Sequence, residues 1–315
     1  MAYLAAGLMN RNWRIETDRG IFALKQIIDV PLVVARRNLN VLAKLVENGV
    51  PACAPAQTVS GDPVAEIDGS GYCLFPWLEG SQPRGSELSV DQAADLGAVL
   101  GRIHQSLNRG DDVDLPGKPA TLRARVTEPT SAVAEADRFL THIARMDSAE
   151  PFDLAVVEFL EHRKILLDKY DAWRPTDDVP LGPFGWTHGD FQHLNVIWRG
   201  GRVVGVIDWD RIRVRSFCEE VARSATLLFG GENGDLDLGR VSAFVAGYRT
   251  VVSLGEEDLT DAVDRLWWKR MCDYWQLEFH YDRGDHSCDH LFLSASRFLD
   301  WWIEHLDEVR YAFVS

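Results

Sequence analysis

The sequence predicts an α+β fold of two lobes, a small lobe with an antiparallel sheet and a larger, mostly helical lobe. At 315 residues and 46% hydrophobic composition, the chain is long enough to bury two cores that share an interface. Its first eighty residues read as short apolar runs broken by glycine and proline, which is typical of strands. Helical spacing dominates from Ser89 onward. We therefore expect an N-terminal lobe of residues 1–80 and a C-terminal lobe of residues 81–315.

Strands are expected first. In residues 3–28, the runs WRIET and IFALKQI are separated by the turn Asp18-Arg19-Gly20, which predicts a hairpin. Residues 33–48 have apolar positions at helical spacing before Gly49, which predicts one helix with a glycine stop. Residues 56–80 then supply two or three further short strands.

The later part of the chain is predicted to be helical. Ser89 and Gln92 have the spacing of a capping box, and an apolar stripe from Leu96 to Leu107 follows them. Residues 109–121 are rich in glycine, proline and aspartate and are expected to form a loop. Further helices are expected near residues 131–146, 152–173, 217–229, 237–252, 259–281 and 290–306.

The composition limits the classes of partner. The net charge is −15, and the imbalance lies in residues 81–315, with 40 acidic and 26 basic residues, against 8 and 7 in residues 1–80. A standing partner that is a nucleic acid or an anionic membrane is not expected, because such surfaces are bound through an excess of lysine and arginine. The acidity serves solubility or the attraction of a cationic ligand. Five cysteines without framework spacing, and the lack of a signal peptide or an apolar run of eighteen residues, favour a soluble cytoplasmic protein.

Polar residues with a distinctive spacing follow in WTHGDFQHLNVIW, residues 186–198, and VIDWD, residues 206–210. The runs NVIW and RVVGVID are joined by Arg199-Gly200-Gly201, which predicts a hairpin with a Gly-Gly turn. Asn195 and Asp208 then lie at the same end of this hairpin, where an amide oxygen and a carboxylate can share a hard cation such as Mg²⁺. The alternative is that these side chains only cap a tight turn.

The pattern HGDxxxxN followed by IDW resembles the aminoglycoside phosphotransferase and choline kinase superfamily, and LGRIHQSL, residues 100–107, resembles a helix of that family. The resemblance implies a protein-kinase-like two-lobe fold and transfer of the γ-phosphate of ATP or GTP to a hydroxyl. It places Asp190 on the acceptor hydroxyl as the catalytic residue. His188 joins it in the catalytic loop and braces that loop, while Asn195 and Asp208 are the Mg²⁺ ligands. Asp210 is secondary, on the strand face of Asp208 or as a cap of the next turn.

The resemblance also implies a nucleotide site in the small lobe. Lys25, the only lysine in the first forty residues, takes the place of the lysine that binds the α- and β-phosphates; the alternative is a lysine exposed on an edge strand. The turn with Gly7, Asn10 and Asn12 resembles the phosphate-covering hairpin, although an ordinary turn reads the same way. A hinge is expected near residues 75–80. There Phe75, Trp77 and Leu78 would contact the adenine; the alternative is a plain connector between lobes.

One position departs from the family pattern. The family pairs its strand lysine with a helix glutamate, and in ARRNLNVL the corresponding residue is Asn38. Glu47, further along the same helix, is a possible substitute. Without either partner, the chain could be a nucleotide-binding pseudokinase rather than an enzyme.

The acceptor is expected to be a small molecule with a hydroxyl, and the acidic C-terminal region suits an aminoglycoside-like or other cationic antibiotic. The alternative is a metabolic kinase for choline, homoserine or a sugar. The acidic residues that suggest a cationic acceptor are Glu219, Glu220, Glu256, Glu257, Asp258, Asp261, Asp264, Asp273, Glu278 and Asp282. Aromatic residues of this region could stack on such a ligand, but their helical spacing is typical of a core: Trp267, Trp268, Tyr274, Trp275, Phe279, Trp301 and Trp302.

The stretch HYDRGDHSCDH gathers His280, His286, Cys288 and His290. Its spacing matches no standard zinc pattern, so it is expected to be a surface loop.

Overall fold

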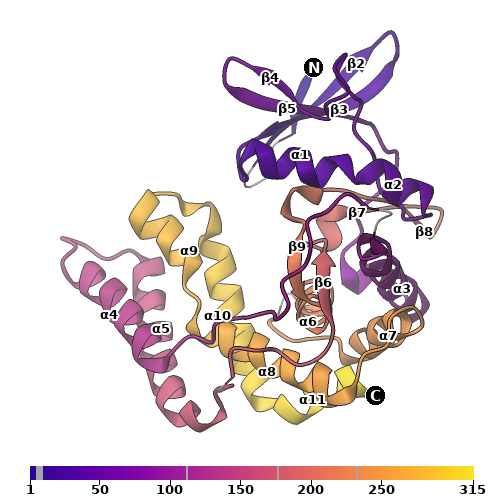
Figure 1. The fold of residues 1–315 in the computed structure, drawn as a ribbon. Coiled ribbons are helices and arrows are strands. Elements are labelled where there is room, and N and C mark those ends of the chain that lie inside the picture. Colours follow the sequence, from indigo (N-terminus) through magenta and orange to yellow (C-terminus); the bar gives the residue numbers. More distant parts are fainter. Residues whose placement is uncertain (5–9, 111–112, 176, 232) are drawn as a thin grey trace.

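The protein has the two lobes of the predicted α+β fold, as the computed structural model shows for residues 1–4, 10–110, 113–175, 177–231 and 233–315 (Figure 1). The small lobe at the top of Figure 1 holds an antiparallel sheet with the strand order β1-β2-β3-β5-β4. The strands of this sheet are β1 (Ala2–Leu4), β2 (Arg11–Thr17), β3 (Gly20–Ile27), β4 (Ala65–Ile67) and β5 (Ser70–Pro76).

The central strand of this sheet carries Lys25. The predicted hairpin is confirmed: β2 pairs with β3 around a turn that ends at Gly20, whose φ of +126° suits glycine. On β3, Lys25 lies opposite Asn12 of β2 and Cys73 of β5. Lys25 is therefore not on an edge strand, and its side chain is buried.

The helix predicted for residues 33–48 is two helices, α1 (Leu32–Asn40) and α2 (Leu42–Glu47). The prediction of one continuous helix is wrong at Val41, where the chain makes a tightened turn (φ −79°, ψ −15°). Leu39 and Val41 are two positions apart, so a regular helix would put them on nearly opposite faces. The break allows Leu39, Val41 and Leu42 all to be buried.

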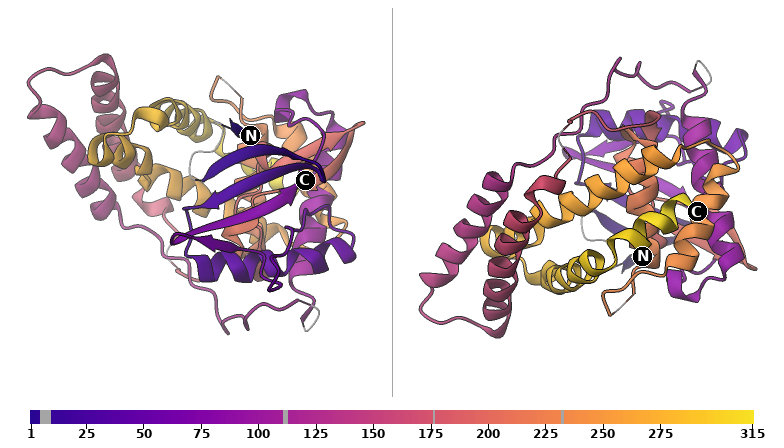
Figure 2. Two further views of the ribbon diagram at one scale, coloured as in Figure 1. Left: turned by 90° about the horizontal axis from the view of Figure 1, so that it is seen from above. Right: turned by 90° about the horizontal axis from the view of Figure 1, so that it is seen from below.

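The larger lobe has a central part and an outer helical part. The central part contains two short two-stranded sheets and the helices packed around them, whereas α4, α5, α9 and α10 extend to one side and are not covered by the small lobe (Figure 2). The strands are β6 (Phe184–Thr187), β7 (Val196–Arg199), β8 (Arg202–Val206) and β9 (Arg213–Ser216). The helices are α3 (Val90–Leu107), α4 (Pro129–Ala144), α5 (Pro151–Lys169), α6 (Phe217–Phe229), α7 (Leu238–Arg249), α8 (Glu256–Cys272), α9 (Trp275–Leu277), α10 (Asp289–Glu304) and α11 (Leu306–Val314).

Most of the predicted helices are confirmed with small shifts, and α3 begins at the predicted capping box of Ser89 and Gln92. The helix predicted for residues 259–281 is wrong beyond Cys272, because Asp273 is extended and the chain continues as α9 and a π-helical turn, η6 (Glu278–Asp282). The helix predicted for 290–306 is α10, and α11 follows it after His305. No helix of the described ranges has both the length and the apolarity that a bilayer span requires.

The core of the larger lobe takes up most of the aromatic residues that could have stacked on a ligand. Trp267, Trp268 and Trp302 are almost completely buried, and so is Tyr274. Within this set Trp275 is the most exposed residue, at 37%. The core interpretation therefore holds for the larger part of the set.

Helices α3 and α7 approach each other unusually closely because glycines lie at their contact. A Cβ atom on Gly97 of α3 would overlap the main-chain oxygen of Phe244, and one on Gly247 of α7 would overlap that of Ala94. Backbone cannot move aside as a flexible side chain can, so these two positions admit only glycine.

We expect Gly97→Ala to lower the free energy of unfolding by about 1–3 kcal/mol, because overpacking outweighs the better helix propensity of alanine. Gly239→Ala is the matched control, since the added methyl on the exposed start of α7 meets only ordinary contacts and should stabilise by up to about 1 kcal/mol. Urea unfolding of both variants measures the sign of each change in the free energy of unfolding. Equal effects of the two changes would contradict the close helix contact.

Candidate active site

The loop after β6 carries His188, Gly189 and Asp190 in a conformation that requires glycine in the middle. Gly189 has a φ of +86°, and a Cβ atom there would overlap the main-chain oxygen of Arg211. Glycine therefore lets the loop turn tightly against the segment after β8. The turn sends the side chains of His188 and Asp190 to different neighbours.

The carboxylate of Asp190 accepts hydrogen bonds from three side chains, those of Asn195, Arg223 and Gln192. Asn195 Nδ2 donates to the main-chain oxygen of Asp190 at 2.8 Å and to its Oδ2 at 3.2 Å. Arg223 of α6 donates from Nη2 to Oδ1 at 2.9 Å, and Gln192 donates to Oδ2 at 3.2 Å. Desolvation opposes ionisation, but the charge and hydrogen bond of Arg223 outweigh it and lower the pKa of Asp190 below its ordinary value. Asp190 is therefore an ionised carboxylate at neutral pH.

The imidazole of His188 is a buried brace. Its Nδ1 accepts from the Asp190 main-chain N–H at 3.2 Å, and its Nε2 lies 3.1 Å from the main-chain oxygen of Ile207. These partners fit the neutral tautomer with the proton on Nε2. Desolvation lowers the pKa of His188, which agrees with a neutral ring. The ring thus links the loop of Asp190 to the end of β8, in keeping with the bracing role expected from the sequence.

The buried carboxylate of Glu220 fixes the backbone of this loop. Glu220 of α6 accepts from the main-chain N–H groups of both His188 and Gly189, and from His104 Nε2 at 2.5 Å. The other ring nitrogen of His104 lies 2.7 Å from the hydroxyl of Tyr248. Desolvation alone would raise the pKa of Glu220, but the hydrogen bond from His104 and the other donors lower it overall. The expectation that Glu220 faces a cationic acceptor is wrong, because its partners lie in the loop of His188 and in α3, more than thirty residues away in sequence.

Lys25 reaches across the lobe boundary to two carboxylates. Its Nζ lies 2.6 Å from Asp208 Oδ1 and 2.6 Å from Asp210 Oδ2. Burial alone would lower the pKa of Lys25, yet the two carboxylates raise it well above its ordinary value. Asn10 donates to Asp210 Oδ2 at 3.1 Å, and its own Oδ1 accepts from the main-chain N–H of Ile28 at 2.8 Å.

The two aspartates differ in exposure and in backbone. The side chain of Asp208 is 38% exposed and that of Asp210 is 1% exposed. Asp208 has a left-handed backbone, with φ +66° and ψ 57°, which is uncommon outside glycine and is often found at functional sites. Asp210 lies in the turn η5 (Trp209–Arg211), not on a strand beside Asp208, so the expectation of a shared strand face is wrong. Desolvation raises the pKa of Asp210.

Neither candidate for the partner of Lys25 is that partner. Asn38 is buried in α1 and donates to the main-chain oxygen of Asp210 at 2.6 Å. Glu47 is exposed and pairs with Lys44 at 3.1 Å. The carboxylates for Lys25 come from the loop after β8, and the amide of Asn38 fixes the backbone of that loop.

The other expected nucleotide residues lie along the sheet and its exit. Asn12 lies on β2 and donates to the main-chain oxygen of Asn10 at 3.5 Å. Phe75 pairs with Ala23 on the sheet, and the guanidinium of Arg14 lies 5.4 Å from the ring centre of Trp77. Leu78 packs toward Gly205 of β8. Gly7 lies outside the described residues.

The predicted hairpin with a Gly-Gly turn is present as β7 and β8, with Val196 opposite Val206. The turn glycines have φ values of +58° and +76°. The main chain just after residue 80 is joined to this hairpin, since Ser81 and Trp198 exchange two hydrogen bonds at 2.9 and 2.8 Å. The exit of the small lobe is thus attached to the hairpin that leads to Asp208.

Several acids that suggested a cationic acceptor are engaged in ion pairs instead. These pairs are Asp261 with Arg265 at 2.7 Å, Asp264 with Arg310 at 2.8 Å and Asp282 with Arg138 at 2.7 Å. Beside Asp190 the nearest charged partner is basic, Arg223, whose side chain is 28% exposed. Arg223 therefore balances the charge of Asp190.

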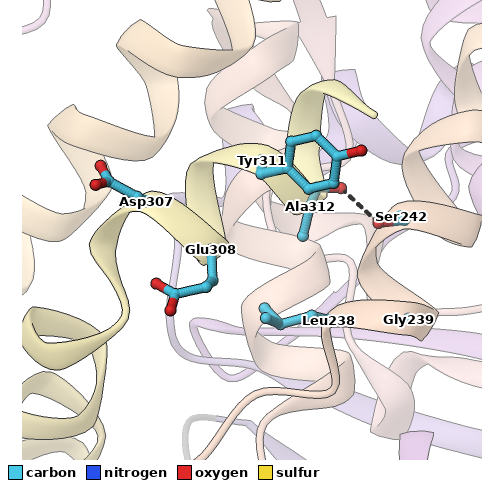
Figure 3. A pocket seen from close by; sticks show the side chains of 7 residues that line it. All are labelled: Leu238, Gly239, Ser242, Asp307, Glu308, Tyr311 and Ala312. Atoms are coloured by element: carbon cyan, nitrogen blue, oxygen red, sulfur yellow. Dashed lines mark hydrogen bonds between the residues drawn. The ribbon is translucent and has the colours of Figure 1, made fainter.

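A hollow of about 630 Å³ lies between α7 and α11, where Ser242 donates to the main-chain oxygen of Ala312 at 2.9 Å (Figure 3). Its lining is Leu238, Gly239, Ser242, Asp307, Glu308, Tyr311 and Ala312. Of the predicted site residues that the structure describes, none is in this lining. The hollow is therefore separate from the loop of Asp190.

A small sheet lobe that carries a buried lysine, and a helical lobe that carries HGDxxxxN and IDWD, define a protein-kinase-like phosphotransferase. The sequence matches the phosphotransferase enzyme family over residues 2–251. The chain belongs to this family and is a small-molecule kinase.

Relatives agree with this assignment. The chain is 24% identical to a homoserine kinase of Methylobacillus glycogenes, over 86% of this chain and 79% of that protein. It is 25% identical to a homoserine kinase of Gluconacetobacter diazotrophicus, over 83% and 74%. Among solved structures, an aminoglycoside phosphotransferase of Alicyclobacillus acidocaldarius has a TM-score of 0.63 at 15% identity, with 99% of this chain and 90% of that chain covered. A spectinomycin phosphotransferase with ADP and spectinomycin has a TM-score of 0.64 at 15% identity, with coverage of 99% and 91%.

We expect Glu220→Gln to lower the free energy of unfolding by about 2–3 kcal/mol. The wild-type carboxylate accepts hydrogen bonds from N–H donors, whereas the N–H₂ group of the new amide would face those donors without a bond. The lowered pKa means that ionised Glu220 stabilises the fold fully above pH 4.5, and that this contribution is lost as the pH falls through the folded-state pKa. The difference in the free energy of unfolding between wild type and variant should narrow only below pH 4.5.

Urea unfolding at neutral pH and below pH 4.5 measures this gap. Glu219→Gln is the matched control one residue earlier, where burial raises the pKa, so the loss of charge should cost little. A gap that is independent of pH would contradict the role of the Glu220 charge.

Proposed function

We propose that the protein transfers the γ-phosphate of ATP or GTP, with Mg²⁺, to a hydroxyl of a small molecule. The observation that carries the proposal is the meeting of three elements at the lobe boundary. Lys25 of the sheet is paired with Asp208 and Asp210, and the loop of Asp190 is joined to the end of β8 through His188. These are the parts that phosphoryl transfer requires, namely a phosphate-binding cation, metal-binding oxygens and a carboxylate for the acceptor.

Asn195 and Asp208 are the proposed Mg²⁺ ligands. The donor set suits a hard cation, since it consists of an amide oxygen and a carboxylate. Asp208 is 38% exposed, and next to it Asp210 Oδ1 is buried without a hydrogen-bond partner among the described residues. Bound Mg²⁺ supplies neutralisation of negative charge on the phosphate oxygens. Asp190 accepts or orients the acceptor proton, and its hydrogen bonds to Asn195 and Arg223 fix its direction.

In the small lobe, we assign Lys25 to the α- and β-phosphates and the hairpin turn with Gly7, Asn10 and Asn12 to the covering of the phosphates. The segment of residues 75–80 is the proposed hinge between the lobes of residues 1–80 and 81–315. Its residues Phe75, Trp77 and Leu78 are assigned to the adenine, because they lie where the sheet leads into the hairpin β7–β8.

For the acceptor, we propose a small hydroxy amino acid of the homoserine type. A carboxylate on the acceptor would find a partner in Arg223, which is partly exposed beside Asp190. The homoserine kinases among the relatives support the same acceptor.

An aminoglycoside-like or other cationic antibiotic is the second candidate, favoured by the net charge of −15. Long-range attraction by this charge would raise the rate of encounter with a polycation. The ion-paired acids of the larger lobe weaken this candidate, because each is already neutralised by an arginine.

Asp190→Asn should lower kcat by roughly 10²–10⁴-fold, since the amide cannot take the acceptor proton. Affinity for MgATP should stay within roughly threefold, a change below about 1 kcal/mol. Initial rates and calorimetric titration with MgATP measure the two quantities. Asp168→Asn, the same change on the exposed surface of α5, should alter neither, and a fully active Asp190→Asn enzyme would sink the assignment.

The acceptor is identified by comparing kcat/KM for homoserine, for 3-aminopropan-1-ol, which lacks only the carboxylate, and for an aminoglycoside. We expect homoserine to be preferred over 3-aminopropan-1-ol by tenfold or more, about 1.4 kcal/mol. In Arg223→Gln this preference should shrink. Any effect of the change on Asp190 acts on both acceptors, so the ratio of their kcat/KM values reports only the contact with the acceptor carboxylate. Preference for the aminoglycoside would move the assignment to the cationic candidate.

A further inference from the structure

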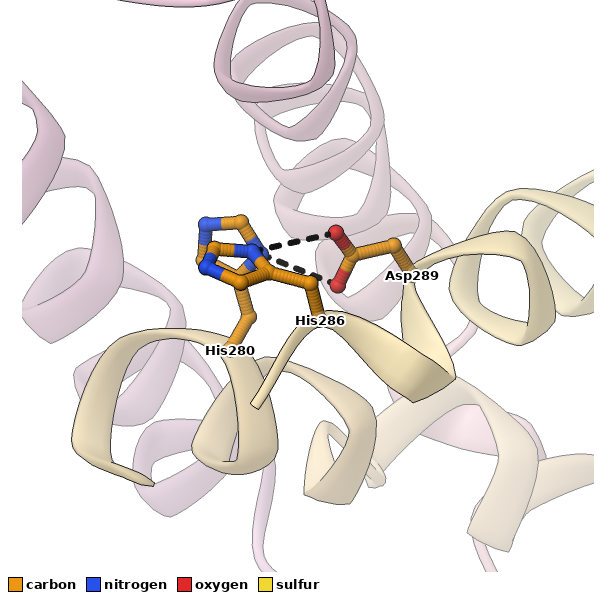
Figure 4. A group of neighbouring side chains, drawn as sticks. All are labelled: His280, His286 and Asp289. Atoms are coloured by element: carbon orange, nitrogen blue, oxygen red, sulfur yellow. Dashed lines mark hydrogen bonds and ion pairs between the residues drawn. The ribbon is translucent and has the colours of Figure 1, made fainter. Parts of the chain in front are cut away.

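Two histidines and an aspartate converge in the outer helical part of the larger lobe. His280 lies in the π-helical turn η6, His286 begins the short helix η7 (His286–Cys288), and Asp289 begins α10. Their side chains point toward one another (Figure 4). The sequence predicts a surface loop here: most of the segment is exposed, but helical turns on both sides of Gly284 replace the loop and bring the three residues together. Cys288 is buried and, like His290, is not part of the group.

The spacing of the ligand atoms fits one small cation. Nδ1 of His280 and Nδ1 of His286 lie 3.1 Å apart. Asp289 Oδ1 lies 2.9 Å from His280 Nδ1, and Asp289 Oδ2 lies 3.5 Å from His286 Nδ1. Ligands at about 2.0–2.1 Å from a tetrahedral ion are separated by about 3.3 Å. The separations of 2.9, 3.1 and 3.5 Å lie on either side of this value, with the two histidines facing different oxygens of Asp289.

Hydrogen bonds alone account poorly for this geometry. Two Nδ1 atoms face each other, and only one proton can lie between them; if both rings were protonated, two positive charges would be in contact. A cation between the rings satisfies both nitrogen lone pairs and the carboxylate at once. A π-helical turn, here the one that carries His280, is also a local distortion that is frequent at functional sites.

The ring of His280 is oriented by its surroundings. It stacks on Phe152 with a centroid distance of 4.6 Å and an interplanar angle of 28°. Its other nitrogen, Nε2, lies 3.9 Å from Oδ1 of Asp153, which is 2% exposed and accepts from the Tyr281 hydroxyl at 2.7 Å. At 3.9 Å this contact is too long for a hydrogen bond, but it places a negative charge beside the ring nitrogen that is not the proposed ligand, as is frequent for a histidine that binds a metal.

We propose that His280, His286 and Asp289 form a binding site for Zn²⁺ or a similar transition-metal cation, distinct from the catalytic Mg²⁺ site. Two imidazoles and one carboxylate suit Zn²⁺, whereas Mg²⁺ and Ca²⁺ take oxygen ligands. Three protein ligands leave a fourth position, which water can fill because the His286 side chain is 67% exposed. The ion joins η6, η7 and the start of α10, so its role is to fix this corner of the outer helices.

Zn²⁺ binding to untagged, reduced protein tests the proposal. The protein is stripped with a chelator, dialysed, and titrated with Zn²⁺ against a chromophoric chelator in excess Mg²⁺, which occupies oxygen-only sites. Wild type should bind one Zn²⁺ per chain, and Co²⁺ should give the intense visible absorption of a four-coordinate site. His286→Ala, a change at an exposed side chain, should lose both signals. His290→Ala is the matched control, because this exposed histidine is outside the group, and it should keep both.

Asp289→Asn is the second variant, and circular dichroism establishes that each variant is folded. This change should weaken Zn²⁺ binding at least tenfold, in line with the loss of a charged ligand. The proposal is overturned if wild type binds no Zn²⁺ in the competition. It is equally overturned if His286→Ala and Asp289→Asn retain the wild-type stoichiometry and affinity, since the metal would then be bound elsewhere.

Discussion

The ion pairs from Lys25 to Asp208 and Asp210 join the two lobes at the site where the chemistry is proposed. A buried ammonium alone would be strongly unfavourable, and two carboxylates at 2.6 Å offset this cost only while the lobes are in register. The sequence separation of 183 residues between Lys25 and Asp208 means that neither lobe can make this contact by itself. The placement of the small lobe against the larger one therefore depends on the contact between Lys25 and the loop after β8.

The loop that carries Asp190 is rigid for a related reason. Glu220 has only acceptor oxygens, and each of its partners is a donor: two main-chain N–H groups of the loop and the ring of His104. With the loop supported from α6 and α3, Asp190 does not need a bound molecule to hold it in place. Its orientation is set before any acceptor arrives, which is the kind of preorganisation that electrostatic catalysis uses.

Sequence patterns predicted the features that are formed by residues close to one another in the chain. The capping box at Ser89, the Gly-Gly turn of β7–β8 and the hydrogen bond from Asn195 to Asp190 within HGDxxxxN all depend on neighbours within a few residues, and each is found in the structure. Predictions failed where the partner is distant in sequence. The family pattern places the carboxylate partner of Lys25 on the helix of Asn38, although the partners are Asp208 and Asp210, and no local pattern indicates the contact of Arg223 with Asp190. Long-range ion pairs leave no periodicity in the sequence from which they could be read.

The left-handed backbone of Asp208 has a consequence for how this fold evolves. Asparagine accepts the same conformation as readily as aspartate, so a single base change in the codon can remove the charge without straining the loop. Asp210 would still pair with Lys25 in such a descendant, and the lobes would keep their contact. At this position, a substitution that removes the proposed metal ligand would leave the fold intact. A duplicated gene could therefore lose the proposed activity in one step while its product keeps the two-lobe fold and the pairing of Lys25 with Asp210.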